Sequence, residues 1–230
     1  MNIEKLSVPI AIVIAGGLIA GAFYYSNLKA VQNSHNQVVK TDSSTSSLRP
    51  ISSEDHIIGN PNADVILVEY SDTECPFCKD FHTSLKRMMT EYGSDGKVAW
   101  VYRHFPIDAL HPKSRKEAEA LECASELGGP AKFWEYTNMI YDITTSNDTL
   151  DPSQLPKIAK SVGLDVTAFN TCLSSGKYAA KVQADYDNAI KIGGRGTPTS
   201  VILTKDGTKT LIEGAQPYDS LKAIIDASLK

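Results

Sequence analysis

The feature that most constrains this chain is the motif Cys75-Pro76-Phe77-Cys78, which separates an apolar run at Val65–Tyr70 from a helix-like run that begins near Lys79. A C-x-x-C motif between a strand and a helix is typical of a redox-active dithiol. Unpaired backbone N–H groups and the helix dipole would favour a thiolate at Cys75. We therefore predict that Cys75 is the exposed nucleophile and that Cys78 begins the buried face of the helix.

Two other uses of the motif are weighed against this hypothesis. A structural zinc site needs a second close pair of ligands, whereas Cys123 and Cys172 stand far apart in the sequence without a neighbouring cysteine or histidine. A purely structural disulfide across one helical turn would restrict little chain entropy. A redox role is favoured over both, and no metal site is predicted.

Composition limits the remaining function classes. The chain has 230 residues, a net charge of −4 and four cysteines, and it can bury one good-sized core. No basic patch is visible, so nucleic acid is not a predicted partner. The cysteines would keep disulfide bonds if the chain is exported to an oxidising compartment.

The N-terminal region carries a candidate export element. No charged residue occurs from Leu6 to Leu28, a stretch long enough to span a bilayer as a helix. Residues 1–28 are predicted to be a membrane anchor, with a signal peptide cleaved after Ala20-Gly21-Ala22 as the alternative. Residues 29–50 are rich in Ser, Thr, Asn and Gln and are predicted to form a disordered linker.

Residues 51–230 are predicted to form the folded domain. Strands are expected at Val65–Tyr70 and Lys97–Phe105, and a hairpin at 199–212 precedes a closing helix at Tyr218–Leu229. Several helical segments between them predict an inserted all-helical subdomain at about 112–192. Its first helix would begin with a capping box from Ser114 to Glu117 and end at Gly128-Gly129-Pro130.

Several segments together resemble the bacterial DsbA-like thiol:disulfide oxidoreductases of the thioredoxin-fold superfamily. They are Glu69-Tyr70-Ser71-Asp72 before the C-x-x-C motif, Arg103-His104-Phe105-Pro106, Leu121-Glu122-Cys123-Ala124 and Gly196-Thr197-Pro198-Thr199. The resemblance covers roughly residue 51 to the C-terminus and implies an α/β thioredoxin fold with a helical insertion. It also implies a cis Thr197–Pro198 bond beside Cys75, where an extended substrate would pair with the backbone.

The resemblance assigns further roles around the site. Glu69 matches a buried acid that assists proton transfer at the second cysteine, and burial would raise its pKa. The alternative is that Glu69 faces a polar edge. Asp72, His82, His104 and His111 are interpreted as capping, surface or core residues. Phe77 replaces a histidine that is common in the most oxidising members, and Pro76 completes the active-site dipeptide.

The remaining cysteines, Cys123 and Cys172, lie on the apolar faces of two predicted helices. Of the three pairings that four cysteines permit, the one also seen in similar proteins joins Cys123 to Cys172 and leaves Cys75 with Cys78 as the redox pair. Such a bond would close a loop of about 50 residues. Two separate buried thiols are the alternative, because free cysteine packs as a small hydrophobe.

The predicted function is a monomeric enzyme, tethered by a single membrane span, that introduces disulfide bonds into reduced exported proteins on the extracytoplasmic side. Signal cleavage would instead give a secreted or periplasmic protein. It would need no cofactor beyond its own disulfide, and the resemblance implies a quinone-linked membrane oxidase as electron acceptor. A reductase or isomerase, and a thiol-dependent chaperone or metal-delivery module without turnover, are the alternative functions.

Overall fold

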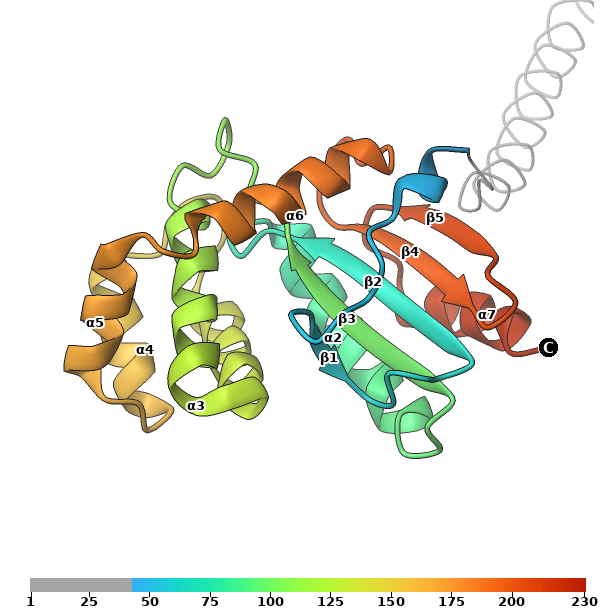
Figure 1. The fold of residues 1–230 in the computed structure, drawn as a ribbon, viewed down its shortest axis with the longest axis horizontal. Coiled ribbons are helices and arrows are strands. Elements are labelled where there is room, and N and C mark those ends of the chain that lie inside the picture. Colours follow the sequence, from blue (N-terminus) through green and yellow to red (C-terminus); the bar gives the residue numbers. More distant parts are fainter. Residues whose placement is uncertain (1–42) are drawn as a thin grey trace, which may run out of the picture. The chain divides into compact units, whose positions relative to one another are not determined.

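The computed structural model describes residues 43–230, which are organised around a five-stranded mixed sheet (Figure 1). The strands are β1 (His56–Ile58), β2 (Val65–Ser71), β3 (Val98–His104), β4 (Thr199–Thr204) and β5 (Lys209–Glu213). Their order across the sheet is β1-β3-β2-β4-β5, in which β2 and β3 are parallel and every other pair is antiparallel. This arrangement confirms the predicted thioredoxin fold.

Helices cover both faces of the sheet (Figure 1). The helices α2 (Pro76–Tyr92) and α7 (Tyr218–Ser228) contact each other on one face, and α6 (Ala179–Lys191) contacts β2 and β3 from the other. The chain between β3 and β4 is helical, as predicted. Before it reaches α6, this insertion comprises α3 (Ser114–Ile143), η2 (Pro152–Gln154), α4 (Leu155–Ser161) and α5 (Val166–Ser175).

The central strand β2 points alternate side chains at these two helical layers. All of its residues are buried, because β3 and β4 flank it and helices lie above and below. Tyr70 faces α6, where its hydroxyl donates a hydrogen bond to Asn188 Oδ1 at 2.5 Å. Glu69 and Ser71 therefore face the opposite layer, which contains α2.

The first helix of the insertion differs from the prediction at both ends. Lys113 is its N-cap and makes no side-chain cap hydrogen bond, so the predicted capping box is absent. Glu117 instead accepts a hydrogen bond from Thr73 Oγ1 at 2.6 Å. The helix is broken at Gly129, where φ is 75° and ψ is −171°, and it resumes at Pro130, a residue that fits the first turn of a helix. The Gly128-Gly129-Pro130 sequence thus produces a kink within α3 and does not end the helix.

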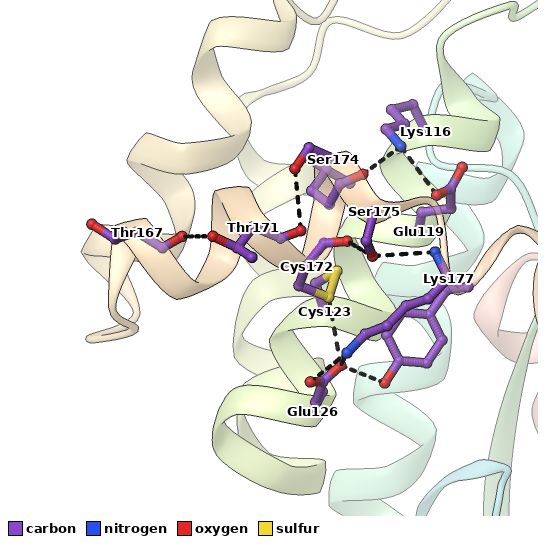
Figure 2. Close-up of a disulfide and its surroundings, with 12 residues drawn as sticks. Lys116, Glu119, Cys123, Glu126, Thr167, Thr171, Cys172, Ser174, Ser175 and Lys177 are labelled. Carbon is purple, nitrogen blue, oxygen red and sulfur yellow. Dashed lines mark hydrogen bonds and ion pairs between the residues drawn. A yellow bond between two sulfur atoms is a disulfide. The ribbon is translucent and has the colours of Figure 1, made fainter.

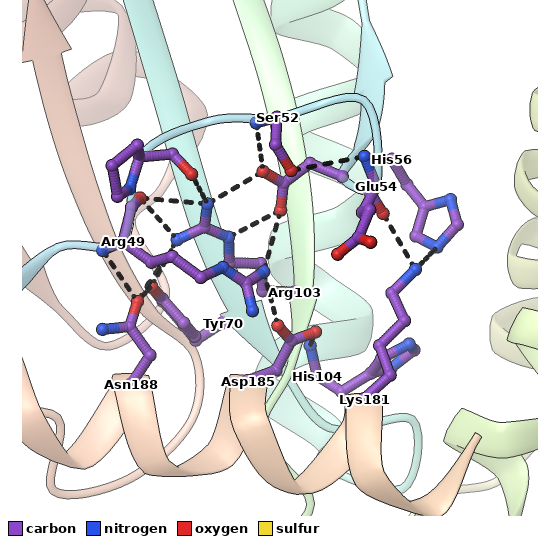
Figure 3. A network of polar contacts seen from close by, with 12 residues as sticks. Arg49, Ser52, Glu54, His56, Tyr70, Arg103, His104, Lys181, Asp185 and Asn188 are labelled. Carbon is purple, nitrogen blue, oxygen red and sulfur yellow. Dashed lines mark hydrogen bonds and ion pairs between the residues drawn. The ribbon is translucent and has the colours of Figure 1, made fainter. Parts of the chain in front are cut away.

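The packed region begins before residue 51. The short helix η1 (Ser43–Ser47) is followed by Leu48, which is buried in the core. Arg103 of β3 donates to the carbonyl oxygens of Arg49 and Pro50 at 3.1 and 3.2 Å and to the carboxylate of Asp55 at 2.8 and 2.9 Å (Figure 3). The last eight residues of the predicted linker, 43–50, are therefore part of the folded domain.

The predicted membrane anchor or signal at residues 1–28, and the rest of the predicted linker, lie outside the described residues. Within residues 43–230, no helix combines the length and the apolar character needed to cross a bilayer.

Candidate active site

The C-x-x-C motif lies at the start of α2. Cys75 is the N-cap residue, with extended backbone angles, and Pro76 opens the helix. Both cysteines are free thiols. Cys75 is 5% exposed and Cys78 is fully buried, so the prediction that Cys75 is the exposed member is wrong. The chemical difference between the two sulfurs comes from their partners more than from their exposure.

The surroundings of Cys75 favour its thiolate. A hydrogen bond from the Cys78 side chain lowers the pKa of Cys75 to about 6, and hydrogen bonds from Thr197 and from the backbone N–H groups of Cys78 and Phe77 act in the same direction. Together these hydrogen bonds outweigh the opposing effect of burial. Cys75 is therefore largely ionised at neutral pH.

The surroundings of Cys78 favour its neutral thiol. Burial raises the pKa of Cys78 well above its usual range, and its contact with Cys75 and the charge of Glu69 raise it further. A hydrogen bond with Ser71 opposes this shift. The backbone N–H of Asp72 also donates to Cys78 Sγ, at 3.4 Å. One sulfur is thus prepared to attack, and the other must lose a proton before it can react.

The loop before β4 lies against the nucleophile. The Thr197–Pro198 bond is cis. The carbonyl oxygen of Thr197 lies 3.4 Å from Cys75 Sγ. This placement leaves backbone groups beside the reactive sulfur, where an extended chain can pair with them.

Glu69 is a fully buried carboxyl beneath the cysteines. Its Oε1 accepts a hydrogen bond from Ser71 Oγ at 2.8 Å, and its Oε2 accepts one from Trp100 Nε1 at 3.0 Å. Burial raises the pKa of Glu69 to about 8, although both hydrogen bonds oppose the shift. The alternative in which Glu69 faces a polar edge is wrong, because β2 is a central strand.

The second residue of the motif is the accessible one. Phe77 is 63% exposed, whereas the cysteines on either side of the Pro76-Phe77 dipeptide are buried. Phe77 therefore places an exposed apolar ring next to Cys75. It contributes no charge to the thiolate.

Two buried carboxyls precede the motif: Asp72, which the sequence analysis interpreted as a capping, surface or core residue, and Glu74, to which it gave no role. Asp72 accepts hydrogen bonds from the backbone N–H groups of Glu74 and Ile107. Glu74 accepts from Thr144 Oγ1 at 2.9 Å and from the N–H of Leu150 at 3.2 Å. Apart from Glu74, which is two residues from Asp72, these partners lie far along the chain. The only sequence signal is the acidic composition of Asp72-Thr73-Glu74, which is equally typical of an exposed loop.

A further cluster joins β1, β3 and α3. His56 Nε2 and His104 Nε2 each lie 2.8 Å from Glu122 Oε1, and these residue types are metal ligands. Lys181 Nζ donates to Glu122 Oε2 at 2.6 Å and so places a positive charge at the cluster. The cluster is a buried polar network in which Lys181 and Glu122 form an ion pair.

The structure joins Cys123 of α3 to Cys172 of α5 in a disulfide with an S–S distance of 2.02 Å (Figure 2). Glu126 lies beside it, 3.5 Å from Cys172 Sγ, and pairs with Lys177. The bond clips α3 to α5 within the helical insertion. The alternative of two separate thiols does not describe this arrangement.

The folded domain matches known proteins over most of its length. A family model described as thioredoxin matches residues 52–227. The solved structure of Pseudomonas aeruginosa DsbA2 is 28% identical and superposes with a TM-score of 0.66, covering 78% of this chain and 96% of that chain. Bacillus subtilis BdbD is 24% identical, with a TM-score of 0.68 and coverage of 79% and 96%, and it supports the fold alone.

The curated relatives that match this chain include proteins named as Na(+)/H(+) antiporters. The Na(+)/H(+) antiporter NhaA 1 of Mycolicibacterium gilvum is 35% identical over 161 residues, which are 69% of this chain and 25% of that protein. The chain thus spans about a quarter of the length of the curated relatives it matches. The family model, the strand order and the buried dithiol agree with one another. The chain belongs to the thioredoxin family, and its domain is DsbA-like, of the thiol-disulfide oxidoreductase class.

Proposed function

We propose that this chain donates disulfide bonds to reduced exported proteins. The observation that carries the proposal is the opposite displacement of the two thiol pKa values, downward at Cys75 and upward at Cys78. A stabilised Cys75 thiolate favours the reduced form of the enzyme and so makes its disulfide a stronger oxidant. The Cys75–Cys78 disulfide is the only redox group that the reaction needs.

The transfer proceeds in two exchanges. A thiolate of the client attacks Cys75 Sγ of the oxidised enzyme, the Cys75–Cys78 bond breaks, and Cys78 leaves and takes up a proton. A second client thiolate then attacks the client sulfur of the mixed disulfide, and Cys75 leaves as the stabilised thiolate. The client has lost two electrons and the enzyme has gained them. Because its pKa is near 8, Glu69 is mostly protonated at neutral pH, which suits a proton donor to Cys78.

The same proposal includes the cellular location and the electron acceptor of this enzyme. The apolar stretch within residues 1–28 would tether a monomer to the cell membrane, with the catalytic domain on the extracytoplasmic side. Cleavage of this stretch would instead release a secreted or periplasmic protein. The Cys123–Cys172 bond supports an oxidising compartment. Electrons would pass to a quinone-linked membrane thiol oxidase, and nucleic acid is not a proposed partner.

The reduction potential of the purified full chain tests the direction of transfer. The protein is equilibrated with glutathione buffers, and the redox state of Cys75 and Cys78 is read by alkylation. We expect a potential near the oxidising end, around −120 mV, whereas a value around −270 mV would assign the chain to the reductases. A Cys75→Ser variant should lose disulfide transfer; a chaperone without redox turnover would keep suppressing aggregation in that variant.

A further inference from the structure

The loop that joins α3 to η2 contains three consecutive residues in the left-handed backbone conformation. Ser146, Asn147 and Asp148 have φ values of 67°, 58° and 64°, and among residues 43–230 they are the only residues other than glycine with a positive φ. This conformation costs free energy for any residue that has a Cβ atom, and it normally occurs at single positions. It persists only where the surrounding contacts hold it.

The residue before the nucleophile holds this loop at both ends. Glu74 is fully buried. Its Oε1 accepts hydrogen bonds from Thr144 Oγ1 at 2.9 Å and from the backbone N–H of Leu150 at 3.2 Å, and its Oε2 accepts one from the N–H of Thr149 at 2.9 Å. Thr144 Oγ1 also accepts from the N–H of Ser146 at 2.9 Å, so the first left-handed residue is bound to the same group.

Two lysines hold the loop from the neighbouring helices. Lys79, in the first turn of α2, donates to the carbonyl oxygen of Thr144 at 2.6 Å. Lys113, the N-cap of α3, donates through Nζ to the carbonyl oxygen of Asp148 at 2.5 Å and through its backbone N–H to Asp148 Oδ1 at 2.8 Å. The loop at 144–150 is therefore bound to the segment before the nucleophile and to the starts of two helices.

The left-handed turn places one backbone donor at the active site. The N–H of Asn147 donates to the carbonyl oxygen of Glu74 at 2.7 Å. The N–H of Cys75, on the other side of the same peptide bond, donates to the carbonyl oxygen of Asp72 at 3.2 Å. Because a peptide bond is planar, these two hydrogen bonds fix the orientation of the peptide that joins Glu74 to Cys75. This orientation decides where Cys75 Sγ lies relative to the N–H groups at the start of α2.

We propose that the loop at 144–150 positions the nucleophile: Asn147 fixes the peptide that carries Cys75, and Glu74 holds the loop in the conformation that this contact requires. The inference rests on the proposed thiol-disulfide exchange and adds two positioning residues to it. Both residues act on Cys75 through its backbone. They keep the sulfur aligned with the backbone donors that stabilise its thiolate.

Asn147→Val tests the proposal without changing a charge. The Asn147 side chain is exposed, and a β-branched residue strongly disfavours a positive φ, so this substitution should turn the N–H away from Glu74 without removing a buried side chain. The reduced full chain is treated with iodoacetamide over a range of pH, and the alkylation of Cys75 is followed by mass spectrometry. The midpoint of this pH profile reports the thiolate of Cys75. The reduction potential is measured in glutathione buffers.

In Asn147→Val the midpoint should rise by about one pH unit, because a hydrogen bond to a charged group is worth about this much. The thiolate fraction below the midpoint then falls roughly tenfold. The potential should become more reducing, since a less stabilised thiolate makes the disulfide a weaker oxidant. Thr144→Val keeps the shape of a buried side chain and removes the hydroxyl that binds Glu74 and Ser146. It should act in the same direction and carries the test if Asn147→Val does not fold.

Asn147→Gly is the matched control. Glycine adopts a positive φ without strain, so this variant removes the same side chain and keeps the conformation of the loop. Its midpoint and its potential should equal those of the wild type. Thr145→Val is a second control, because it places the same β-branched residue at an exposed position of the loop that lies outside the left-handed segment.

Two outcomes overturn the positioning role and leave the proposed function standing. One is a loss of stability in Asn147→Val, measured in urea, with the midpoint and the potential of the wild type, which would assign the loop a structural role alone. The other is an equal shift in Asn147→Val and Asn147→Gly, which would mean that the side chain matters and the conformation does not. A reductase-like potential of the wild type, together with the expected shift in Asn147→Val, would overturn the proposed direction of transfer and support the positioning role.

Discussion

Two cysteines three positions apart acquire opposite acidities because they occupy different places on the same helix. Cys75 lies before the first turn of α2, where backbone N–H groups point at its sulfur. Cys78 lies within that turn, on the side that packs against the sheet, and is fully buried. Cys75 is therefore suited to act as the nucleophile, whereas Cys78 keeps its proton at neutral pH.

Phe77 offers a substitution that tests how charge sets the redox strength. Because its ring is 63% exposed, Phe77→His should not disturb the core. Below a pH of about 6.5 an imidazolium next to the Cys75 thiolate would stabilise it, and each tenfold gain in preference for the reduced form raises the potential by about 30 mV. Equilibration with glutathione at low and high pH measures the shift. The control Phe77→Leu should leave the potential unchanged, and an equal shift in both variants would contradict this reason.

Glu117, which is not part of the cysteine pair, should make the stability of the fold depend on pH. Burial raises its pKa to about 8 from the ordinary 4.5, although the hydrogen bond from Thr73 opposes the shift. Its protonated form is therefore favoured by folding, and this stabilisation is complete below pH 4.5 and is lost as the pH rises through 8. Glu117→Gln should match the wild type at low pH and exceed its free energy of unfolding by about 5 kcal/mol above pH 8, because a rise of the pKa from 4.5 to about 8 corresponds to about 1.4 kcal/mol per unit.

Urea unfolding of both proteins across this pH range checks the prediction. Glu69 has a similarly raised pKa, but it is present in both proteins, so the difference between them isolates Glu117. A difference that does not change with pH would mean that the Glu117 carboxyl is already ionised in the folded protein.

At the scale of elements, the insertion combines a broken helix with a covalent clip. Gly129 has a positive φ, a conformation that glycine adopts without strain, and it lets α3 change direction between its two segments. The first of these segments carries Cys123, and α5 carries Cys172. The disulfide therefore holds the two helices together through cysteines that are 49 positions apart in the sequence.

Removal of this bond should cost stability without changing the redox site. Closing a loop of 49 residues stabilises a fold by about 4 kcal/mol in the chain-entropy model. Cys123→Ala with Cys172→Ala should lower the free energy of unfolding by about that amount, as measured in urea. The potential of Cys75 and Cys78 should stay the same, since these residues belong to another helix. An unchanged free energy of unfolding would show that packing alone holds α3 to α5.

At the scale of the whole molecule, one buried guanidinium connects segments that are distant in the sequence. Arg103 of β3 is fully buried and binds the chain at Arg49 and Pro50, the carboxylate of Asp55 and the hydroxyl of Tyr70 (Figure 3). Burial acts to raise the pKa of Asp55, but the Arg103 guanidinium holds it below its ordinary value. The segment from Arg49 to Asp55 is therefore held against the sheet by the positive charge of Arg103 on β3.

Replacing this guanidinium should destabilise the domain strongly. Arg103→Met leaves the Asp55 carboxylate buried without its main partner, and such a loss typically costs about 3–5 kcal/mol. Arg103→Met with Asp55→Asn removes both charges and should recover part of the loss. Thermal and urea unfolding measure both variants. A double variant no more stable than the single one would show that the backbone contacts of Arg103, and not its charge, hold the segment.

The sequence by itself determined the features that depend on local patterns. The C-x-x-C motif between an apolar run and a helical repeat predicted the dithiol at a helix N-terminus, and helical periodicity predicted the insertion between the strands. These features need only neighbouring residues, because strand alternation, helical spacing and turn residues act over short distances. The kink at Gly129 was missed because glycine and proline can equally end a helix or begin the next one.

Only the tertiary structure decided which distant groups share an environment. It buried Cys75 beneath the loop at Thr197, placed the Ser71 hydroxyl beside Glu69, and brought Glu117 to Thr73. Burial and pairing depend on how helices and strands pack, and the same serine or glutamate would be ordinary on a surface. The acidity of each group, and with it the chemistry, follows from desolvation and from partners that no local pattern records.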